Sequence, residues 1–400
     1  MSQKVGFSRF LPFLLLLFTG AGQGATLLVL QFHNDSQQAD LNWVGESIAE
    51  TLRVEFGAND QIVLSREARA EGLRRLGLRP DAQFTKATLI KLGQSLDVDY
   101  VCYGGYDFTL PSGDTELRNS SVQIETRFVD LRKMRDGPQL SEAGKLADLS
   151  RLQEHLAWQS LKFLEPGANL PAEQFMTYQK FIRLDAQESY IRGLFSSHGE
   201  QQKKWFTQAN IIDSHFVGPI FELGKLAYEQ KDYRQAVTWF GRVPANDSRY
   251  TDARFRMGLS AYSANDYTGA ANYFREVAKT VPLNEVYNNL GAAEEAMGLA
   301  SAVVDLRKAA EGDPNDMTYR FNLGLALLRN NSFDEAATTL QAVVDHNAGD
   351  TQARTLLDRA RRREFNPSNA RPLAPTRLKQ NFDETAFRQL KAMLQPKGSA

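Results

Sequence analysis

One feature constrains the fold of this chain more than any other: a pattern that returns about every thirty-four residues between positions 217 and 350. Four glycines mark it, at steps of 34, 33 and 33 residues: Gly224, Gly258, Gly291 and Gly324. Each glycine is followed by an alanine and then by a large apolar residue, in the pairs Ala236 and Phe240, Ala270 and Phe274, Ala302 and Leu306, and Ala336 and Leu340. Such a period is typical of a stacked supersecondary unit.

The spacing predicts two antiparallel helices in each repeat. Glycine and alanine let the two helices approach closely, and the large apolar residue fills the space between them. A single pair of helices cannot bury its apolar face, so the repeats must stack on one another. The sequence therefore predicts an all-α solenoid over roughly half of the chain.

The pattern resembles the tetratricopeptide repeat, which also carries a proline at its exit, as Pro282 and Pro314 do here. The resemblance implies a solenoid over residues 186–350, with four clear repeats from 217 and one degenerate repeat from 186. A capping helix with a polar outer face is expected over residues 351–364.

The preceding residues, 26–164, predict an α/β domain. Thr26–Phe32 is a continuous apolar run, as expected for a strand buried on both faces, whereas Val122–Leu131 alternates strictly, as in an antiparallel strand with one wet face. Further strands are expected at 61–64, 99–108 and 139–144, and helices at 41–56, 66–76, 85–96 and 149–164. Strands alternating with helices predict a mixed sheet of about five strands with flanking helices.

Three short motifs in this domain carry local expectations. Gly104-Gly105 predicts a bulge or a tight exit from a strand, and Asp136-Gly137-Pro138 predicts a turn. His33-Asn34-Asp35-Ser36 has turn chemistry, with a small-ligand site at the carboxyl end of a strand as the alternative. Cys102 lies in an apolar strand and is expected to be buried packing, because no basic residue adjoins it in sequence to lower its pKa.

The domain resembles the TolB amino-terminal-like domain over residues 26–108, and more loosely to 164. The usual proline before the phenylalanine that ends the strand is replaced by Gln31. The matching segments are 29–36, 43–50, 64–66, 92–93 and 98–101. The resemblance implies a non-catalytic α/β interaction module, because that family shares no active site.

Residues 1–25 have the features of a cleaved secretory signal peptide. Lys4 and Arg9 form a positive region, Phe10–Phe18 is apolar, and small residues follow up to Ala25. The apolar run is about half of the ~20 residues that a membrane span needs, and no cysteine at the cleavage region marks a lipoprotein. We therefore expect an exported, periplasmic protein that is cleaved between Ala21 and Ala25.

Two connecting regions complete the predicted organisation. Residues 165–185 are expected to form a linker and a lead-in helix, with the helix at 172–183. Residues 365–381 are expected to be a flexible linker because three prolines, at 367, 372 and 375, exclude a helix. Residues 382–394 predict an amphipathic helix, whose apolar side needs cover from this protein's own groove or from another chain.

The composition excludes several classes of function. The formal net charge is −1 and no basic block is present, which argues against nucleic acid or an anionic membrane as the main partner. The five histidines show no metal-ligand spacing, and no glycine-rich phosphate loop is followed by lysine. We expect no enzyme activity, no cofactor and no metal.

The candidate binding surface is the groove that the first helix of each repeat lines in the tetratricopeptide family. The resemblance places the following residues there: Phe221, Lys225, Tyr228, Phe255, Leu259, Tyr262, Asn288, Asn289, Phe321, Asn322, Leu325 and Arg329. Aromatic rings provide contact area and asparagines can pair with an extended peptide backbone, although these asparagines could instead only join neighbouring helices. The family's clamp for a terminal carboxylate is not reproduced, because Phe221 and Lys225 occupy its basic and asparagine positions.

These observations predict a non-enzymatic scaffold or assembly factor of the bacterial envelope that binds protein or peptide partners. The alternative is a sensor, in which the α/β domain binds a small molecule and the repeats relay its state.

Overall fold

The computed structural model describes residues 25–36, 38–109, 119–167, 169–177, 181–365, 375–383, 386–387 and 390. Residues 1–24 of the predicted signal peptide lie outside them. The amino-terminal domain, residues 26–164, is called the head below. Its sheet has six strands: β1 (Thr26–Val29), β2 (His33–Asn34), β3 (Ile62–Val63), β4 (Tyr100–Thr109), β5 (Ser121–Asp130) and β6 (Arg135–Lys145).

The sheet is mixed, as the sequence predicts. Its order is β3-β1-β4-β5-β6, with β2 paired to β4. Strand β1 runs parallel to β3 and β4, whereas β4, β5 and β6 form an antiparallel meander. The parallel part is the region where helices separate the strands in sequence.

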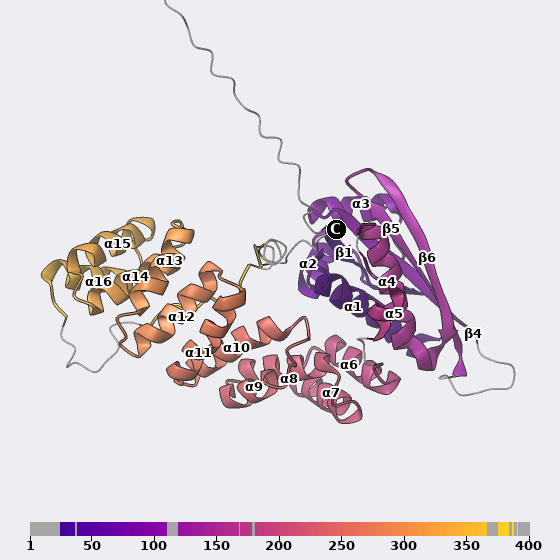
Figure 1. Cartoon of the computed structure of the whole chain (residues 1–400). Helices are drawn as coiled ribbons and strands as arrows, with labels where there is room; N and C mark the ends of the chain where they lie inside the picture. The colour runs from indigo at the N-terminus through magenta and orange to yellow at the C-terminus, as the bar shows by residue number, and fades with distance from the viewer. Residues whose placement is uncertain are drawn as a thin grey trace, which may run out of the picture.

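Helices cover both faces of this sheet (Figure 1). On one face lie α1 (Trp43–Ala58) and α4 (Leu149–Leu164), which share a core with Leu27 and Val29 of β1. On the other face lie α2 (Arg66–Arg75) and α3 (Lys86–Ser95), which pack against Leu28 and Leu30. Burial on both faces explains the continuous apolar run. Two short 3₁₀ turns, η1 (Ala39–Leu41) and η3 (Leu146–Asp148), precede α1 and α4.

The prediction of a bulge or strand exit at Gly104-Gly105 is wrong. Both glycines pair in register with β5, opposite Thr126 and Glu125. A Cβ atom on Gly104 would lie 1.9 Å from the carbonyl oxygen of Glu125, and one on Gly105 would lie 2.4 Å from the Asp35 carboxylate. The glycines are therefore explained by close packing within a regular strand.

The predicted turn at 136–138 is also wrong, since these residues lie inside β6. The chain instead reverses over residues 131–134, where Met134 has a left-handed φ of 48°. The register between β5 and β6 shifts where Gly137 and Pro138 pass Phe128. Proline has no N–H to donate to a ladder, so an irregular point on an edge strand accommodates it.

The second half of the chain is a solenoid of paired helices (Figure 1). Residues 184–362 form α6 (Leu184–Phe195), α7 (Gly199–Ile212), α8 (Val217–Glu229), α9 (Tyr233–Phe240), α10 (Tyr250–Ser263), α11 (Tyr267–Thr280), α12 (Asn284–Ala296), α13 (Ala302–Gly312), α14 (Met317–Arg329), α15 (Phe333–His346) and α16 (Thr351–Arg362). Helices α8 to α15 are the four clear repeats, α6 and α7 correspond to the degenerate one, and α16 covers the end.

The repeated glycines lie where the two helices of a pair meet. A Cβ atom on Gly224 would lie 2.6 Å from the Phe240 ring, and one on Gly258 would lie 2.6 Å from the Phe274 ring. In the degenerate pair, a Cβ atom on Gly193 would lie 2.4 Å from the ring of Phe206. The same contact therefore sets the helix separation in each of these pairs.

The head and the first repeats share one hydrophobic core. Tyr190 and Ile191 of α6 and Leu223 of α8 belong to the cluster that includes Leu52 and Phe56 of α1. The lead-in helix between them is shorter than predicted, because α5 spans only Ala172–Thr177 and residues 181–183 are not helical. Helix α6 then begins at Leu184 and packs against α1.

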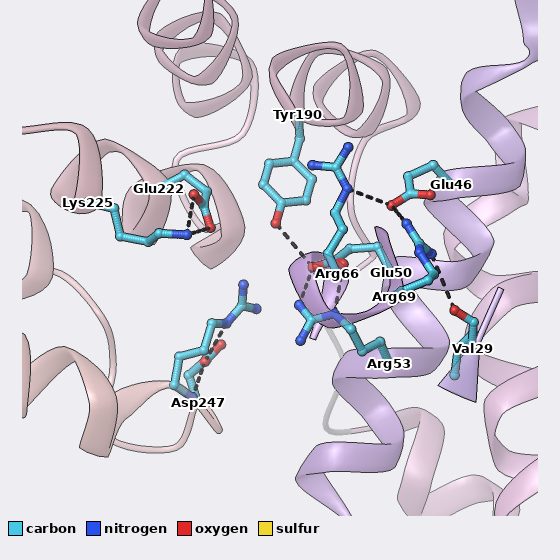
Figure 2. A network of polar contacts seen from close by, with 11 residues as sticks. Val29, Glu46, Glu50, Arg53, Arg66, Arg69, Tyr190, Glu222, Lys225 and Asp247 are labelled. Atoms are coloured by element: carbon cyan, nitrogen blue, oxygen red, sulfur yellow. Dashed lines mark hydrogen bonds and ion pairs between the residues drawn. The ribbon is translucent and has the colours of Figure 1, made fainter. Parts of the chain in front are cut away.

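Polar contacts reinforce this junction (Figure 2). Glu46 of α1, whose side chain is 1% exposed, receives hydrogen bonds from Arg66 and Arg69 of α2. Arg66 also donates to the carbonyl oxygen of Leu194 in α6, at 2.7 Å. The hydroxyl of Tyr190 donates to Glu50 at 3.3 Å. Burial acts to raise the pKa of Glu50, but Arg53 beside it, with Arg249 and Arg66, lowers that pKa to about 2.

Candidate functional site

Residues 375–382 of the chain lie across one side of the solenoid, with no helix or strand in residues 375–379 and a bend at 380–381. We call them the docked segment, and we call the side that they touch, on helices α8, α10, α12 and α14, the inner face. The prediction of a flexible linker over 365–381 is therefore corrected for residues 375–381, which make specific contacts; residues 366–374 lie outside the described part of the chain. Contacts with distant residues hold the docked segment in place, and no local sequence pattern reveals such contacts.

Two asparagines bind the backbone of the docked segment at alternate residues. Asn322 accepts a hydrogen bond from the Arg377 N–H and donates one to the Arg377 carbonyl oxygen, both at 2.8 Å. Asn289 does the same with the N–H and carbonyl oxygen of Lys379, again at 2.8 Å. Each side-chain amide thus makes the two hydrogen bonds that a neighbouring β-strand would make. Such bonds recognise the backbone of a peptide and not its side chains.

A third asparagine links these contacts. Asn288 donates to the carbonyl oxygen of Arg377 at 3.0 Å and to Asn289 at 3.1 Å, and it accepts a bond from Asn322 at 2.8 Å. All three asparagines are fully buried. Asn288 and Asn322 therefore join α12 to α14, and all three asparagines contact one another or the docked segment of the same chain.

The basic side chains of the docked segment reach two aspartates. Arg377 donates to Asp350 at 2.7 Å, and its guanidinium lies 3.5 Å from the centroid of the Phe321 ring. Lys379 donates to Asp316, and its ammonium lies 4.8 Å from the centroid of the Tyr319 ring. Each cation therefore has both a carboxylate and an aromatic face.

The pKa values of Asp316 and Asp350 are both lowered in the folded protein. Burial acts to raise the pKa of Asp316, but hydrogen bonds from Lys379 and from the backbone of Thr318 outweigh it and lower the pKa. Burial acts in the same way on Asp350, and the backbone N–H of Ala353 together with Arg377 lowers its pKa. Both groups are therefore held as anions that face the docked segment.

The other side chains of the docked segment make apolar and hydroxyl contacts. The ring of Phe382 packs edge-on against Phe255, with centroids 5.3 Å apart, and Leu378 joins the same cluster. The hydroxyl of Tyr228 donates to Gln380 at 3.1 Å, and that of Tyr262 pairs with Thr376.

The predicted carboxy-terminal helix is described only in part. The side chain of Asp383 accepts a hydrogen bond from the backbone of Ala386, as an N-cap does, and Phe387 packs against Phe382 with ring centroids 5.3 Å apart. Residues 391–394 of the predicted helix lie outside the described part. The extended segment that precedes this helix, rather than the helix alone, covers the inner face.

The structure brings seven of the predicted groove residues together around the docked segment: Tyr228, Phe255, Tyr262, Asn288, Asn289, Phe321 and Asn322. Other predicted residues have partners elsewhere. Lys225 pairs with Glu222 at 3.0 Å near the head, and Arg329 pairs with Glu295 at 3.0 Å. Phe221 lies beneath Arg256, whereas Leu259 and Leu325 are buried between helices.

Sequence reasoning missed Tyr319, Asp316 and Asp350. The two aspartates precede the first turns of α14 and α16 and accept backbone hydrogen bonds there, so in sequence they are indistinguishable from ordinary helix caps. They could have been found only by comparing the repeats. The residues that precede α8, α10 and α12 are Phe216, Arg249 and Leu283, and none of them caps its helix through a side chain.

A second candidate site is a cleft of about 230 Å³ in the head, near the end of β1. His33-Asn34 forms β2 in parallel with β4 rather than only a turn. Asp35 beside it accepts a hydrogen bond from Gln83 at 3.0 Å, and Glu125 and Arg127 line the cleft from β5. Charged and amide groups thus converge on a small hollow.

Among the described residues, no three histidine, cysteine, aspartate or glutamate side chains gather in a metal-binding arrangement. Cys102 is completely buried, and burial raises the pKa of its thiol well above the ordinary value. Every described helix also falls short of the length and apolar character that a membrane span requires.

Comparison with known proteins bears on the solenoid. Two family models, each described as the tetratricopeptide repeat, match residues 221–285 and 291–360. No curated protein matches the chain significantly.

Solved structures that are similar to the chain include other repeat proteins. MamA from Desulfovibrio magneticus RS-1 is 20% identical, covers 42% of this chain and 99% of its own, and has a TM-score of 0.39. YrrB, described as a repeat protein of this type with an unusual peptide-binding site, is 19% identical over 48% of this chain and 93% of its own, with a TM-score of 0.35. Similarities this low carry no inference about what this chain binds.

The family matches coincide with α8 to α16, where the glycines and their apolar partners recur. Over residues 221–285 and 291–360, the solenoid of this chain is therefore built from tetratricopeptide repeats.

Proposed function

We propose that this protein is a non-enzymatic scaffold or assembly factor whose inner face binds an extended peptide segment of a partner protein. One observation carries the proposal: the inner face holds the backbone of residues 377–379, with both backbone groups of Arg377 and of Lys379 bound by asparagine side chains. A surface that hydrogen-bonds the backbone N–H and C=O groups of alternate residues can bind any extended chain whose side chains fit.

The energetics favour a peptide ligand over a folded surface. Asn288, Asn289 and Asn322 are buried beneath the docked segment, and buried amides without partners cost roughly 1–3 kcal/mol each. A ligand that displaces the segment must therefore present free backbone groups, which extended peptides have and helices lack. The partner contributes a segment that is unpaired in its own fold.

Random-peptide display on the full chain tests the proposal. The displayed library is selected on a variant with Leu378→Asp and Phe382→Asp, which removes the apolar anchors of the docked segment. We expect extended peptides to be enriched, and we expect Asn289→Ala with Asn322→Ala to abolish the enrichment. Equal enrichment with and without the two asparagines would show that the inner face is not the binding surface.

The proposal includes export to the periplasm. It rests on the sequence of residues 1–25, where a positive region, an apolar run and small residues follow one another. Amino-terminal sequencing of the protein from a periplasmic fraction should give a first residue between Gly22 and Thr26. An intact Met1 on protein confined to the cytoplasm would refute export.

The alternative function, a small-molecule sensor, has one observation in its favour, the cleft lined by His33, Asp35, Glu125 and Arg127. A ligand that binds the folded head raises its melting temperature. A screen of small metabolites against the full chain, repeated with Arg127→Ala, therefore separates the two functions. A shift that Arg127→Ala removes favours the sensor, and no shift with any compound removes its support.

A further inference from the structure

We propose that the inner face selects its ligand by charge spacing: two basic residues two positions apart, followed three positions later by an aromatic residue. Residues 377–382 are then the chain's own copy of this ligand, with Arg377, Lys379 and Phe382 in the three places. The inference rests on the proposed function, because it names the kind of peptide that the inner face binds.

The spacing follows from the backbone contacts. Asn322 and Asn289 bind residues 377 and 379, and alternate residues of an extended chain point to the same side, about 6.6 Å apart. On that side lie Asp350 and Asp316, which accept hydrogen bonds from Arg377 and Lys379. The two aspartates occupy equivalent places one repeat apart, as the caps of α14 and α16, and each accepts a hydrogen bond from one of the two cations.

The surroundings of the two ion pairs favour positive side chains at both peptide positions and disfavour negative ones. The side chains of Asp350 and Asp316 are 11% and 20% exposed, and those of Arg377 and Lys379 are 30% and 27% exposed. Phe321 and Tyr319 lie against the two cations. A peptide with acidic residues at these places would meet two partly buried anions and the negative faces of two rings, which is a repulsive arrangement.

The aspartates are specific to this end of the inner face. The first helices α8, α10 and α12 begin without a side-chain cap, after Phe216, Arg249 and Leu283. The aromatic place is defined separately, by the edge-on contact of Phe382 with Phe255 on α10. The peptide therefore runs from α16 towards α10, with its basic residues first and its aromatic residue last.

The docked segment is tethered to the solenoid, so it competes with any ligand at a high effective concentration. A partner that carries the same spacing must displace it. Competition with the docked segment therefore favours ligands that carry both basic residues and the aromatic residue over ligands that carry only one of them.

The test uses the full chain and a fluorescent peptide with the sequence of residues 375–383. Arg377→Glu with Lys379→Glu should free the inner face, which faster hydrogen exchange of the backbone N–H groups at positions 377 and 379 reports, and should tighten peptide binding about tenfold or more over the unaltered chain. A second peptide with glutamate at both basic places should not bind. Arg354→Glu with Arg362→Glu changes two exposed arginines of α16 and should leave peptide binding as in the unaltered chain.

A conservative pair separates recognition from folding. Asp316→Asn with Asp350→Asn keeps the caps of α14 and α16, because asparagine caps a helix as well as aspartate, but removes both charges. The melting temperature should change little. The preference for the basic peptide over one with glutamine at positions 377 and 379 should fall about tenfold.

Several results would overturn the charge spacing. They are unchanged hydrogen exchange at positions 377 and 379 after Arg377→Glu with Lys379→Glu, equal binding of the basic and acidic peptides, and a basic preference that survives the loss of both aspartates. If the freed inner face still enriches displayed peptides without this spacing, the proposed function stands and only the charge spacing fails. If the freed inner face binds no peptide at all, both fail.

Discussion

Three buried asparagines and two aspartates give the inner face its chemistry. The positions of Asn288, Asn289 and Asn322 follow from the repeat, so sequence alone locates them on the first helices. Sequence could not show what they bind, because their ligand lies 55 to 90 positions further along the chain. Sequence alone also could not predict the roles of Asp316 and Asp350, because an aspartate at the start of a helix is already explained as a helix cap.

The asparagine contacts lead to a direct prediction. Asn289→Ala with Asn322→Ala removes four hydrogen bonds to the backbone of the docked segment, each worth roughly 0.5–1.5 kcal/mol. We expect hydrogen exchange at Arg377 and Lys379 to accelerate by tenfold or more while the helices stay folded. Asn246→Ala, at an exposed asparagine, is the control and should change nothing. Unaltered protection of the segment would show that the asparagines do not hold it.

A buried carboxyl in the head gives a pH-dependent prediction. Burial, with Glu55 nearby, raises the pKa of Glu154 to about 7, from 4.5 in an unfolded chain. The folded state therefore holds the proton more tightly, so stability is highest below pH 4.5, falls as the pH rises to about 7, and is constant above. Glu154→Gln removes this loss and should stabilise the protein by roughly 2–3 kcal/mol at pH 8, with little gain at pH 5.

Denaturant unfolding at the two pH values measures the effect of Glu154→Gln. Glu200→Gln, at an exposed glutamate of α7, is the matched control and should give the same stability as the unaltered chain at both. A gain of equal size at pH 5 and pH 8 would mean that the carboxyl of Glu154 does not titrate in this range.

At the scale of elements, periodic patterns predicted the structure well and irregular ones did not. The recurring glycines identify the helix pairs because one steric requirement repeats, and the alternation at 122–131 identifies β5. Gly104-Gly105 and Asp136-Gly137-Pro138 were misread because turn residues are also used for close packing and for irregular edges. The docked segment was misread as flexible because proline excludes a helix but not an extended chain bound to other helices.

The packing of one repeat can be tested by a single methyl group. Gly258→Ala improves helix propensity but places a Cβ atom 2.6 Å from the Phe274 ring. We expect a net loss of about 1–3 kcal/mol from overpacking. Gly199→Ala, at the open start of α7 with no atom within 4 Å, is the control and should be neutral or slightly stabilising. Thermal unfolding of both variants checks this, and a stabilising Gly258→Ala would contradict the packing.

At the scale of the whole molecule, the head and the solenoid are joined by a shared core and by the polar contacts of Figure 2. Sequence divided the chain correctly into an α/β domain and a solenoid, but it could not show this junction. The junction depends on contacts between distant residues, such as Arg66 with Leu194 and Tyr190 with Glu50.

The junction predicts cooperative unfolding of the head with the first repeats. Glu46→Ala leaves Arg66 and Arg69 without their buried carboxylate, and breaking such a pair costs about 3–5 kcal/mol. We expect one unfolding transition for head and first repeats in the unaltered chain, and a lower or split transition in the variant. Glu71→Ala, which removes an exposed partner of Arg74 and Arg75, should have little effect. Independent melting of head and repeats in the unaltered chain would refute the junction.

The central claim is that the inner face binds an extended backbone through alternate residues, and amide hydrogen exchange at single-residue resolution tests it most directly. Selective ¹⁵N labelling of arginine, lysine and leucine in the full chain separates residues 377, 379 and 378. The account predicts slow exchange at Arg377 and Lys379, whose N–H groups donate to Asn322 and Asn289, and fast exchange at Leu378, whose N–H has no acceptor among the described residues. Exchange as fast at Arg377 and Lys379 as in a free peptide would contradict it.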